Sequence, residues 1–127
     1  MNRELIDLER NSNATCVIVK TGEYRSLTPA VAIDADTPDK YLPAGEKPFF
    51  ADMVDLKCKM NKNCFFTIVD IDRATIEEQN RFVSLVKDRE LYGYNLPKNC
   101  TIVLTVRNED LLKNISPDLY HFSVVAI

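Results

Sequence analysis

Three apolar runs, each about the length of one β-strand, divide the chain and limit what it can fold into. They are TCVIVK at residues 15–20, CFFTIVD at 64–70 and CTIVLTV at 100–106, all rich in β-branched or aromatic side chains. Nearly continuous apolar runs are typical of strands covered on both faces, as in parallel sheets. Helical or turn-forming segments separate the runs, so the sequence predicts an α/β domain with a mostly parallel sheet.

Shorter segments complete the predicted order of elements, α-β-β-α-β-α-β-α-β. The remaining strands are expected at residues 31–34 and 122–127, and helices at 3–10, 48–60, 75–90 and 109–113. Gly93 and Pro97 predict a tight connection or a small hairpin. With helices on both faces of the sheet, the 127 residues are expected to form one three-layer domain, 1–127.

Two of the predicted helices carry specific signals. Thr75 and Glu78 have the spacing of a capping box, so the third helix should begin there. Its core face is expected to contain Ile76, Phe82, Val83 and Val86. After Pro48, Phe49, Met53, Leu56 and Met60 recur at helical spacing, which predicts a helix through residue 60. The cluster of Tyr41, Phe49 and Phe50 could instead bind a partner, although core packing is the favoured interpretation for the phenylalanines.

Composition limits the compartment and the partners. The formal net charge of −3 gives no electrostatic reason for nucleic acid or an anionic membrane to be the main partner. No apolar run approaches the roughly 20 residues that span a bilayer, and the first ten residues lack the apolar stretch of a signal peptide. We therefore expect a cytoplasmic protein.

The cysteines are expected to be reduced and structural. They are Cys16, Cys58, Cys64 and Cys100. Cys58 and Cys64 bracket KMNKN, a spacing unlike that of common zinc ligands, and the one histidine, His121, is distant in sequence. No metal site is therefore predicted.

Polar residues follow two of the apolar runs and are the best candidates for a site. Asp70 and Asp72 follow the run at 64–70, and Arg107 and Asn108 follow the run at 100–106. In open parallel sheets, ligands bind beyond the carboxyl ends of the strands.

From residue 64 to the C-terminus, the chain resembles the AAA+ ATPases, most closely the MoxR-like branch. The resemblance rests on FTIVDIDRA at 66–74, EEQNRF at 77–82, DRELYGYNLPKNCTIVLTVRN at 88–108 and ISPDLYHF at 115–122. The pieces occur in the family's order, whereas residues 1–63 diverge. The resemblance implies a P-loop NTPase core, here expected to lack the family's C-terminal helical lid.

The resemblance assigns family positions to Asp70, Asn108 and His121, which together with Asp72 are the relic catalytic candidates. Aligned on Arg73 and Ala74, Asp70 takes the place of the catalytic Glu, Asn108 that of the sensor Asn, and His121 that of the Arg in Asp-Arg-Phe. In that alignment Val69 replaces the magnesium-associated Asp. A shift by one makes Asp70 the magnesium ligand but leaves no catalytic Glu, so the acidic pair is incomplete in either register.

The phosphate-binding loop is absent from the sequence. The loop needs Gly-x-x-x-x-Gly-Lys-[Ser/Thr], because backbone N–H groups, the lysine and the hydroxyl together hold the phosphates and Mg²⁺. The only glycines are Gly22, Gly45 and Gly93, and none precedes a Gly-Lys pair. Phosphoryl transfer depends almost wholly on positioning and charge neutralisation. ATP and Mg²⁺ are therefore disfavoured as cofactors, and hydrolysis is not expected.

Each candidate residue also has an ordinary structural interpretation. Asp70 and Asp72 could hold a divalent cation, but two solvated strand-end carboxylates are favoured. Asn108 could instead cap the helix after it. His121 could be a base, but a partly buried structural histidine is favoured. Arg73 could act on a neighbouring subunit's nucleotide, but a surface ion pair with Glu77 is favoured.

The leading hypothesis is a degenerate AAA+-like domain that acts through protein–protein contacts, with an AAA+ ATPase or with itself. One alternative is an ATPase subunit completed by a partner. Another is a module that binds a small anion near Arg73 and Arg107.

Overall fold

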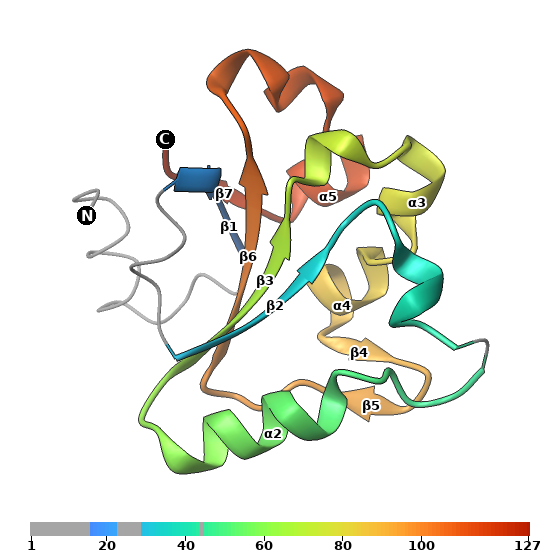
Figure 1. Cartoon of the computed structure of the whole chain (residues 1–127), viewed down its shortest axis with the longest axis vertical. Helices are drawn as coiled ribbons and strands as arrows, with labels where there is room; N and C mark the ends of the chain where they lie inside the picture. Colours follow the sequence, from blue (N-terminus) through green and yellow to red (C-terminus); the bar gives the residue numbers. More distant parts are fainter. Residues whose placement is uncertain (1–15, 23–28, 44) are drawn as a thin grey trace.

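The computed structural model describes residues 16–22, 29–43 and 45–127, and its centre is one parallel sheet (Figure 1). The sheet has the order β2-β3-β6-β1-β7, and every neighbouring pair is parallel. Its strands are β1 (Cys16–Lys20), β2 (Ala30–Asp34), β3 (Cys64–Val69), β6 (Cys100–Val106) and β7 (Val124–Val125). The predicted α/β class with a mostly parallel sheet is confirmed.

The first two strands are parallel members of this sheet but not neighbours, because β3 and β6 lie between them. Only residues 21–29 connect them, fewer than the dozen or more that a crossover between parallel strands ordinarily needs. The sequence left open whether β1 and β2 form a parallel pair or a hairpin. They form neither, because they are not neighbours in the sheet. The segment 23–28 and the helix expected at 3–10 lie outside the described residues.

The helices and turns follow the predicted order. The α-helices are α2 (Ala51–Met60), α3 (Ile76–Asn80), α4 (Val83–Asp88) and α5 (Pro117–His121). Short 3₁₀ segments are η2 (Pro38–Lys40), η3 (Ile71–Arg73) and η4 (Glu109–Asn114). The expected hairpin consists of β4 (Glu90–Leu91) and β5 (Tyr94–Asn95). Tyr92 and Gly93 at its tip both have positive φ, as a two-residue type I′ turn requires.

The main core lies between one face of the sheet and the helices. Ile18, Phe66 and Leu104 point to this face, where they pack with buried residues of α2, α4 and α5. Val17 and Val103 point to the opposite face, whose smaller buried cluster contains strand residues and Ala126. In the described part of the chain the helices therefore cover one face (Figure 1), and the expected second helical layer is not found there.

The apolar residues whose spacing predicts α2 do not face the core. Phe49, Met53, Leu56 and Met60 are 67, 51, 52 and 73% exposed. The buried face of the helix is made instead by Phe50, Ala51, Val54 and Cys58. Phe50 packs on Phe66 of β3 with ring centroids 4.3 Å apart. The prediction that Phe50 belongs to the core is therefore confirmed, and the same prediction for Phe49 is not.

The predicted helix at 75–90 is divided into α3 and α4. It begins as expected, because Thr75 and Glu78 form a reciprocal capping box. The chain tightens just after Asn80, where the Phe82 N–H donates to Gln79 O at 3.0 Å, three residues back. This turn buries Phe82 completely, whereas Ile76, expected in the core, is exposed.

No helix among the residues described here is both long and apolar enough to cross a bilayer.

Candidate functional site

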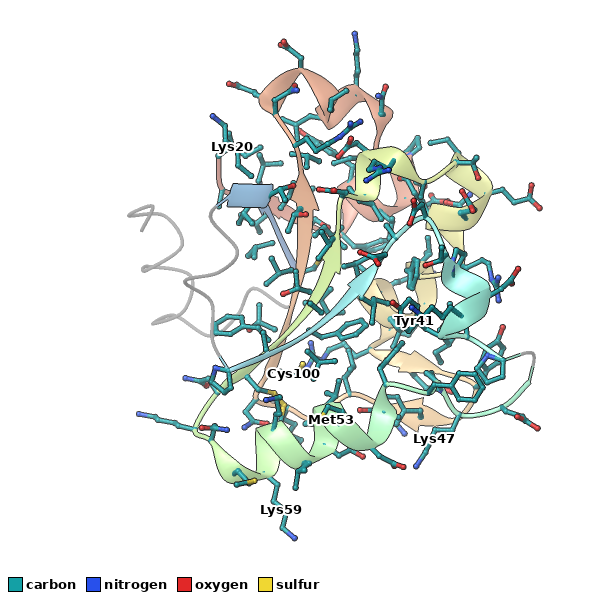
Figure 2. All side chains as sticks on the ribbon, in the orientation of Figure 1. Lys20, Tyr41, Lys47, Met53, Lys59 and Cys100 are labelled. Atoms are coloured by element: carbon teal, nitrogen blue, oxygen red, sulfur yellow. A yellow bond between two sulfur atoms is a disulfide. The ribbon has the colours of Figure 1, made fainter. Side chains whose placement is uncertain are left out.

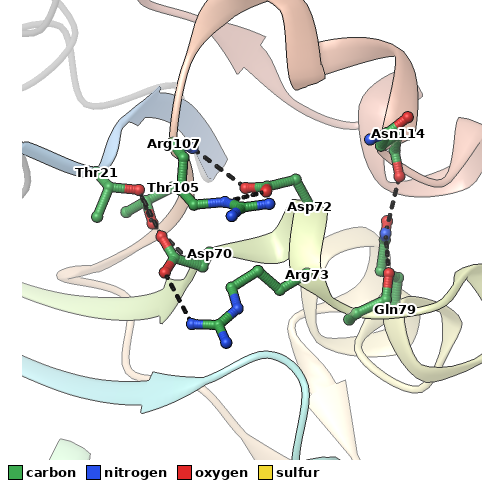
Figure 3. A network of polar contacts seen from close by, with 9 residues as sticks. Thr21, Asp70, Asp72, Arg73, Gln79, Thr105, Arg107 and Asn114 are labelled. Carbon is green, nitrogen blue, oxygen red and sulfur yellow. Dashed lines mark hydrogen bonds and ion pairs between the residues drawn. The ribbon is translucent and has the colours of Figure 1, made fainter.

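The carboxyl ends of β1, β3 and β6 meet at one edge of the sheet, where they bring together a polar network (Figure 3). The Thr21 hydroxyl follows β1 and donates to Asp70 Oδ1 at 2.6 Å. Thr105 Oγ1, on β6, accepts the Asp70 N–H at 2.7 Å and lies 3.2 Å from Thr21 Oγ1. The sequence singled out Asp70 but neither threonine, because a threonine inside or just after a β-branched run looks like an ordinary strand residue.

Asp70 stands where β3 turns into η3, with φ 55° and ψ 57°. This left-handed conformation is uncommon outside glycine, although Asp adopts it more readily than most residues. The threonine contacts fix both its backbone N–H and its carboxylate. Asp70 is therefore a positioned residue rather than a freely solvated one, which corrects the expectation from sequence.

Asp72 is also not solvated, because its side chain is completely buried. It accepts hydrogen bonds from the backbone N–H of Arg107 at 3.1 Å and from Arg107 Nε at 2.7 Å. A buried carboxylate needs such partners, since burying an unpaired charge costs several kcal/mol. The pair fastens η3 to the end of β6.

The two arginines expected to hold an anion face carboxylates instead. Arg107 binds Asp72, and Arg73 Nη1 lies 4.0 Å from Asp70 Oδ2 (Figure 3). The sequence favoured an ion pair between Arg73 and Glu77. In the structure Arg73 pairs with Asp70 instead. Each guanidinium charge at this edge is opposed by an internal carboxylate.

Asn108 and His121 do not join the network. Asn108 precedes η4 in an extended conformation, as a capping residue does, but its side chain makes no capping hydrogen bond. His121 ends α5, where it is exposed rather than partly buried, and its ring meets the edge of Phe122 with centroids 4.8 Å apart. It lines a surface hollow of about 450 Å³ between η4 and α5, together with Leu112 and Tyr120.

The buried side chain of Gln79 holds three segments of the chain together. Its buried amide nitrogen donates to Ala74 O at 3.0 Å and to Asn114 O at 2.9 Å, and its oxygen accepts the Ser116 N–H at 2.6 Å. The Ser116 hydroxyl donates to Asn80 Oδ1. Gln79 thereby joins α3 to η4 and α5, which the pattern of apolar residues alone could not indicate.

Three cysteines gather at the opposite edge of the sheet. Cys58 and Cys64 form a disulfide, so the expectation that all cysteines are reduced is wrong for this pair. Cys100 lies beside them, with the three sulfur atoms within 4.8 Å of one another. Across the described residues this is the single group of three or more His, Cys, Asp or Glu side chains close enough to share a metal ion. Asp70 and Asp72 belong to no such group.

Comparisons with known proteins bear on the fold. No protein-family model matches the sequence, and no curated protein matches it. A crystal structure of NtrX from Brucella abortus is similar, with a TM-score of 0.52 at 15% sequence identity. The alignment covers 97% of this chain but only 35% of NtrX, so the chain spans about a third of that protein's length. At this identity the likeness shows a shared α/β fold and nothing about activity.

Proposed function

We propose that the chain is a degenerate AAA+-like core, related to the MoxR branch, that acts through protein–protein contact and does not hydrolyse ATP by itself. The sheet order supports the fold part of this proposal. Doubly wound dinucleotide-binding and flavodoxin-like sheets keep the first strand beside the second. Here β6 is inserted between the first and third strands, so the order differs from both of those sheets, and this insertion brings the end of β6 between Thr21 and Asp70.

The observation that carries the proposed contact function is the α2 apolar stripe, made of Phe49, Met53, Leu56 and Met60. These large side chains recur at intervals of three and four residues, so they lie along one side of α2 and of the turn before it. All four are more than half exposed. A contiguous apolar surface of this kind marks an interaction site more often than it occurs by chance.

The charges around the stripe support a second copy of the chain as the occupant. Asp52 lies in the first turn of α2, where its exposed carboxylate also binds Lys47 Nζ of its own chain at 2.7 Å, and Lys57 and Lys59 lie in the last turn. Asp52 and Lys59 are about two helical turns apart and therefore on the same side of the helix. When two copies of α2 pair antiparallel about a two-fold axis, Asp52 of one copy lies opposite Lys59 of the other, twice. Lys59 extends away from the sheet, free to make this contact (Figure 2).

One helix face makes a small interface, so the expected dimer is weak and depends on concentration. Specific interfaces that bury less than about 1,200 Å² belong to transient complexes. Methionine suits such a surface because its flexible side chain adapts to a partner.

Sedimentation over a range of concentrations tests the contact. We expect the wild-type chain to dimerise reversibly, and Leu56→Glu to remain monomeric with its free energy of unfolding changed by no more than about 0.5 kcal/mol. Ile76→Glu is the matched control, because Ile76 is a similarly exposed apolar residue on α3. Asp52→Lys and Lys59→Asp should each weaken the dimer, and the double variant should restore it. A wild-type chain that stays monomeric at all concentrations, or charge variants without mutual rescue, would contradict self-association in favour of another partner.

The polar network supports the absence of hydrolysis. The carboxylate of Asp72 is paired with Arg107, and that of Asp70 contacts Thr21 and Arg73. The sequence also holds no glycine-rich loop with a lysine to bind the phosphates. Calorimetric titration with ATP–Mg²⁺ should give no saturating heat at micromolar nucleotide. Saturation in that range would favour the alternative of an ATPase subunit completed by a partner. The same titration with inorganic phosphate tests the anion-binding alternative at Arg73 and Arg107.

A further inference from the structure

The cysteine cluster arises where two strands and a helix meet. Cys64 opens β3 and Cys100 opens β6, and the two are register partners in adjacent strands, so their side chains lie next to each other on the helix-covered face. Cys58 comes from the last turn of α2, which lies over this face. Figure 2 shows Cys100 beside α2. All three cysteines are buried, with their sulfur atoms within 4.8 Å of one another.

Polar contacts around the cluster hold its three parts in place. The Asn99 side chain donates to Cys58 O at 2.8 Å and to Asn61 O and Lys62 O at 3.1 Å, which ties the end of α2 to the start of β6. Arg89 Nη2 donates to Cys100 O at 2.7 Å. Its Nη1 is buried without a hydrogen-bond partner. A cationic group therefore lies beside the one cysteine of the three that is outside the disulfide.

We propose that the reduced chain binds one thiophilic d¹⁰ metal ion, such as Cu(I) or Zn(II), through the thiolates of Cys58, Cys64 and Cys100, and that the Cys58–Cys64 disulfide closes this site. Thiolate ligands select such soft ions over Mg²⁺ or Ca²⁺. Three sulfur ligands satisfy a trigonal Cu(I) ion, whereas Zn(II) takes a fourth ligand from solvent. Arg89 would offset part of the negative charge that three thiolates bring into the core.

The conversion between the two states is balanced in electrons and protons. A dithiol reductant gives two electrons and two protons to the Cys58–Cys64 disulfide, which becomes two thiols while the reductant becomes a disulfide. The metal ion then displaces the three thiol protons to solvent as it binds. A disulfide oxidant reverses the sequence: it takes two electrons from the Cys58 and Cys64 thiolates and, with two protons from solvent, becomes a dithiol, while the ion leaves and Cys100 regains a proton from solvent.

The competing interpretation is a structural disulfide with Cys100 as a neighbouring packing residue. The two interpretations differ at Cys100, which contributes to metal binding and not to the disulfide. Cys16 provides a matched control, because it is equally buried but belongs to no such cluster.

The experiment titrates Cd²⁺ into the reduced chain without oxygen, following thiolate-to-metal charge-transfer absorption and the metal content after gel filtration. We expect one ion per chain, and competition by Cu(I) and Zn(II). Cys16→Ser should bind as the wild type does, whereas Cys100→Ser and Cys100→Ala should bind at least about tenfold more weakly. Oxidation of the wild type to the Cys58–Cys64 disulfide should lower the mass of the chain by two hydrogen atoms and abolish Cd²⁺ binding. Circular dichroism identifies any variant that fails to fold, and the second substitution at Cys100 then provides the comparison.

Failure to bind one ion per chain, or equal binding by Cys16→Ser and both Cys100 variants, would overturn the proposal. Leu56→Glu tests whether metal binding is independent of the proposed dimer. The substitution lies on the outer face of α2, so it should leave metal binding unchanged.

Discussion

At the scale of single residues, burial decides which of the strand-end charges matters to the fold. Asp70 and Asp72 look alike in the sequence, both as carboxylates just after an apolar run. In the structure Asp72 is completely buried against Arg107, whereas Asp70 keeps a fifth of its side chain exposed. A buried, charge-assisted pair is costly to break because the remaining group is left without its partner.

Asp72→Asn should therefore destabilise the fold by about 2–3 kcal/mol. An asparagine amide can accept one of the two Arg107 hydrogen bonds, but its NH₂ group would face the other donor. Arg73→Ala is the control, because Arg73 is half exposed and only 4.0 Å from its carboxylate, so its effect should stay within about 0.5 kcal/mol. Urea denaturation measures the free energy of unfolding of both variants. Equal losses in Asp72→Asn and Arg73→Ala would show that the Asp72 contact does not stabilise the fold.

The residues that complete the two clusters were not predictable from one sequence. Thr21 and Thr105 are 84 positions apart and meet because β1 and β6 are neighbours. Cys64 and Cys100 meet for the same reason, through the register of β3 and β6. Strand order and register are set by long-range packing, and a local pattern carries no signal for either.

At the scale of elements, continuous apolar runs were the most reliable signal. The strands expected at 15–20, 64–70 and 100–106 match β1, β3 and β6 to within a residue, because a strand buried on both faces leaves little room for polar residues. The capping box at Thr75 likewise gave the start of α3, since its two hydrogen bonds are local.

The buried face of α2 could not be predicted at this scale. Its sequence offers apolar residues on two sides, and the spacing of Met53, Leu56 and Met60 indicates a helix without deciding which side meets the sheet. The sheet instead accepts the smaller Ala51, Val54 and Cys58, which let the helix lie close to β2 and β3. The large side chains remain outside, where they form the α2 apolar stripe.

At the scale of the whole molecule, two separate edges of one sheet carry different chemistry. The carboxyl edge is closed by internal ion pairs and hydrogen bonds, whereas the amino edge holds the three cysteines under α2. The α2 helix connects the two proposals, since its inner side supplies Cys58 and its outer side the apolar stripe. Metal binding and self-association are therefore separable by substitutions on opposite sides of a single helix.

Burial also gives the molecule a dependence on alkaline pH. Burial raises the pKa of the Cys16 thiol from 9.0 to about 12, against the opposing effects of its hydrogen bond with Ser123 and of the Arg89 charge. Burial, followed by the hydrogen bond to Asp55, raises the pKa of Tyr94 above its ordinary 10.0. Burial likewise raises the pKa of the free Cys100 thiol from 9.0 to about 11. The folded chain therefore keeps three protons that the unfolded chain releases. These groups stabilise the fold fully below about pH 9, and that stability is lost as the pH rises.

We expect the free energy of unfolding of the metal-free chain to be insensitive to these groups between about pH 7 and 8.5. Above about pH 9, Cys16 and Cys100 should together make it fall by up to about 2.7 kcal/mol per pH unit, and above about pH 10 Tyr94 should add about half as much again to that slope. Denaturation by urea at a series of pH values measures the slope. Tyr94→Phe should remove the second part of the decline, at the cost of the Asp55 hydrogen bond at every pH, whereas Tyr120→Phe, on the exposed side of α5, should leave the profile unchanged. If Tyr94→Phe and Tyr120→Phe lost stability with the same slope above pH 10, ionisation of Tyr94 would not be coupled to folding.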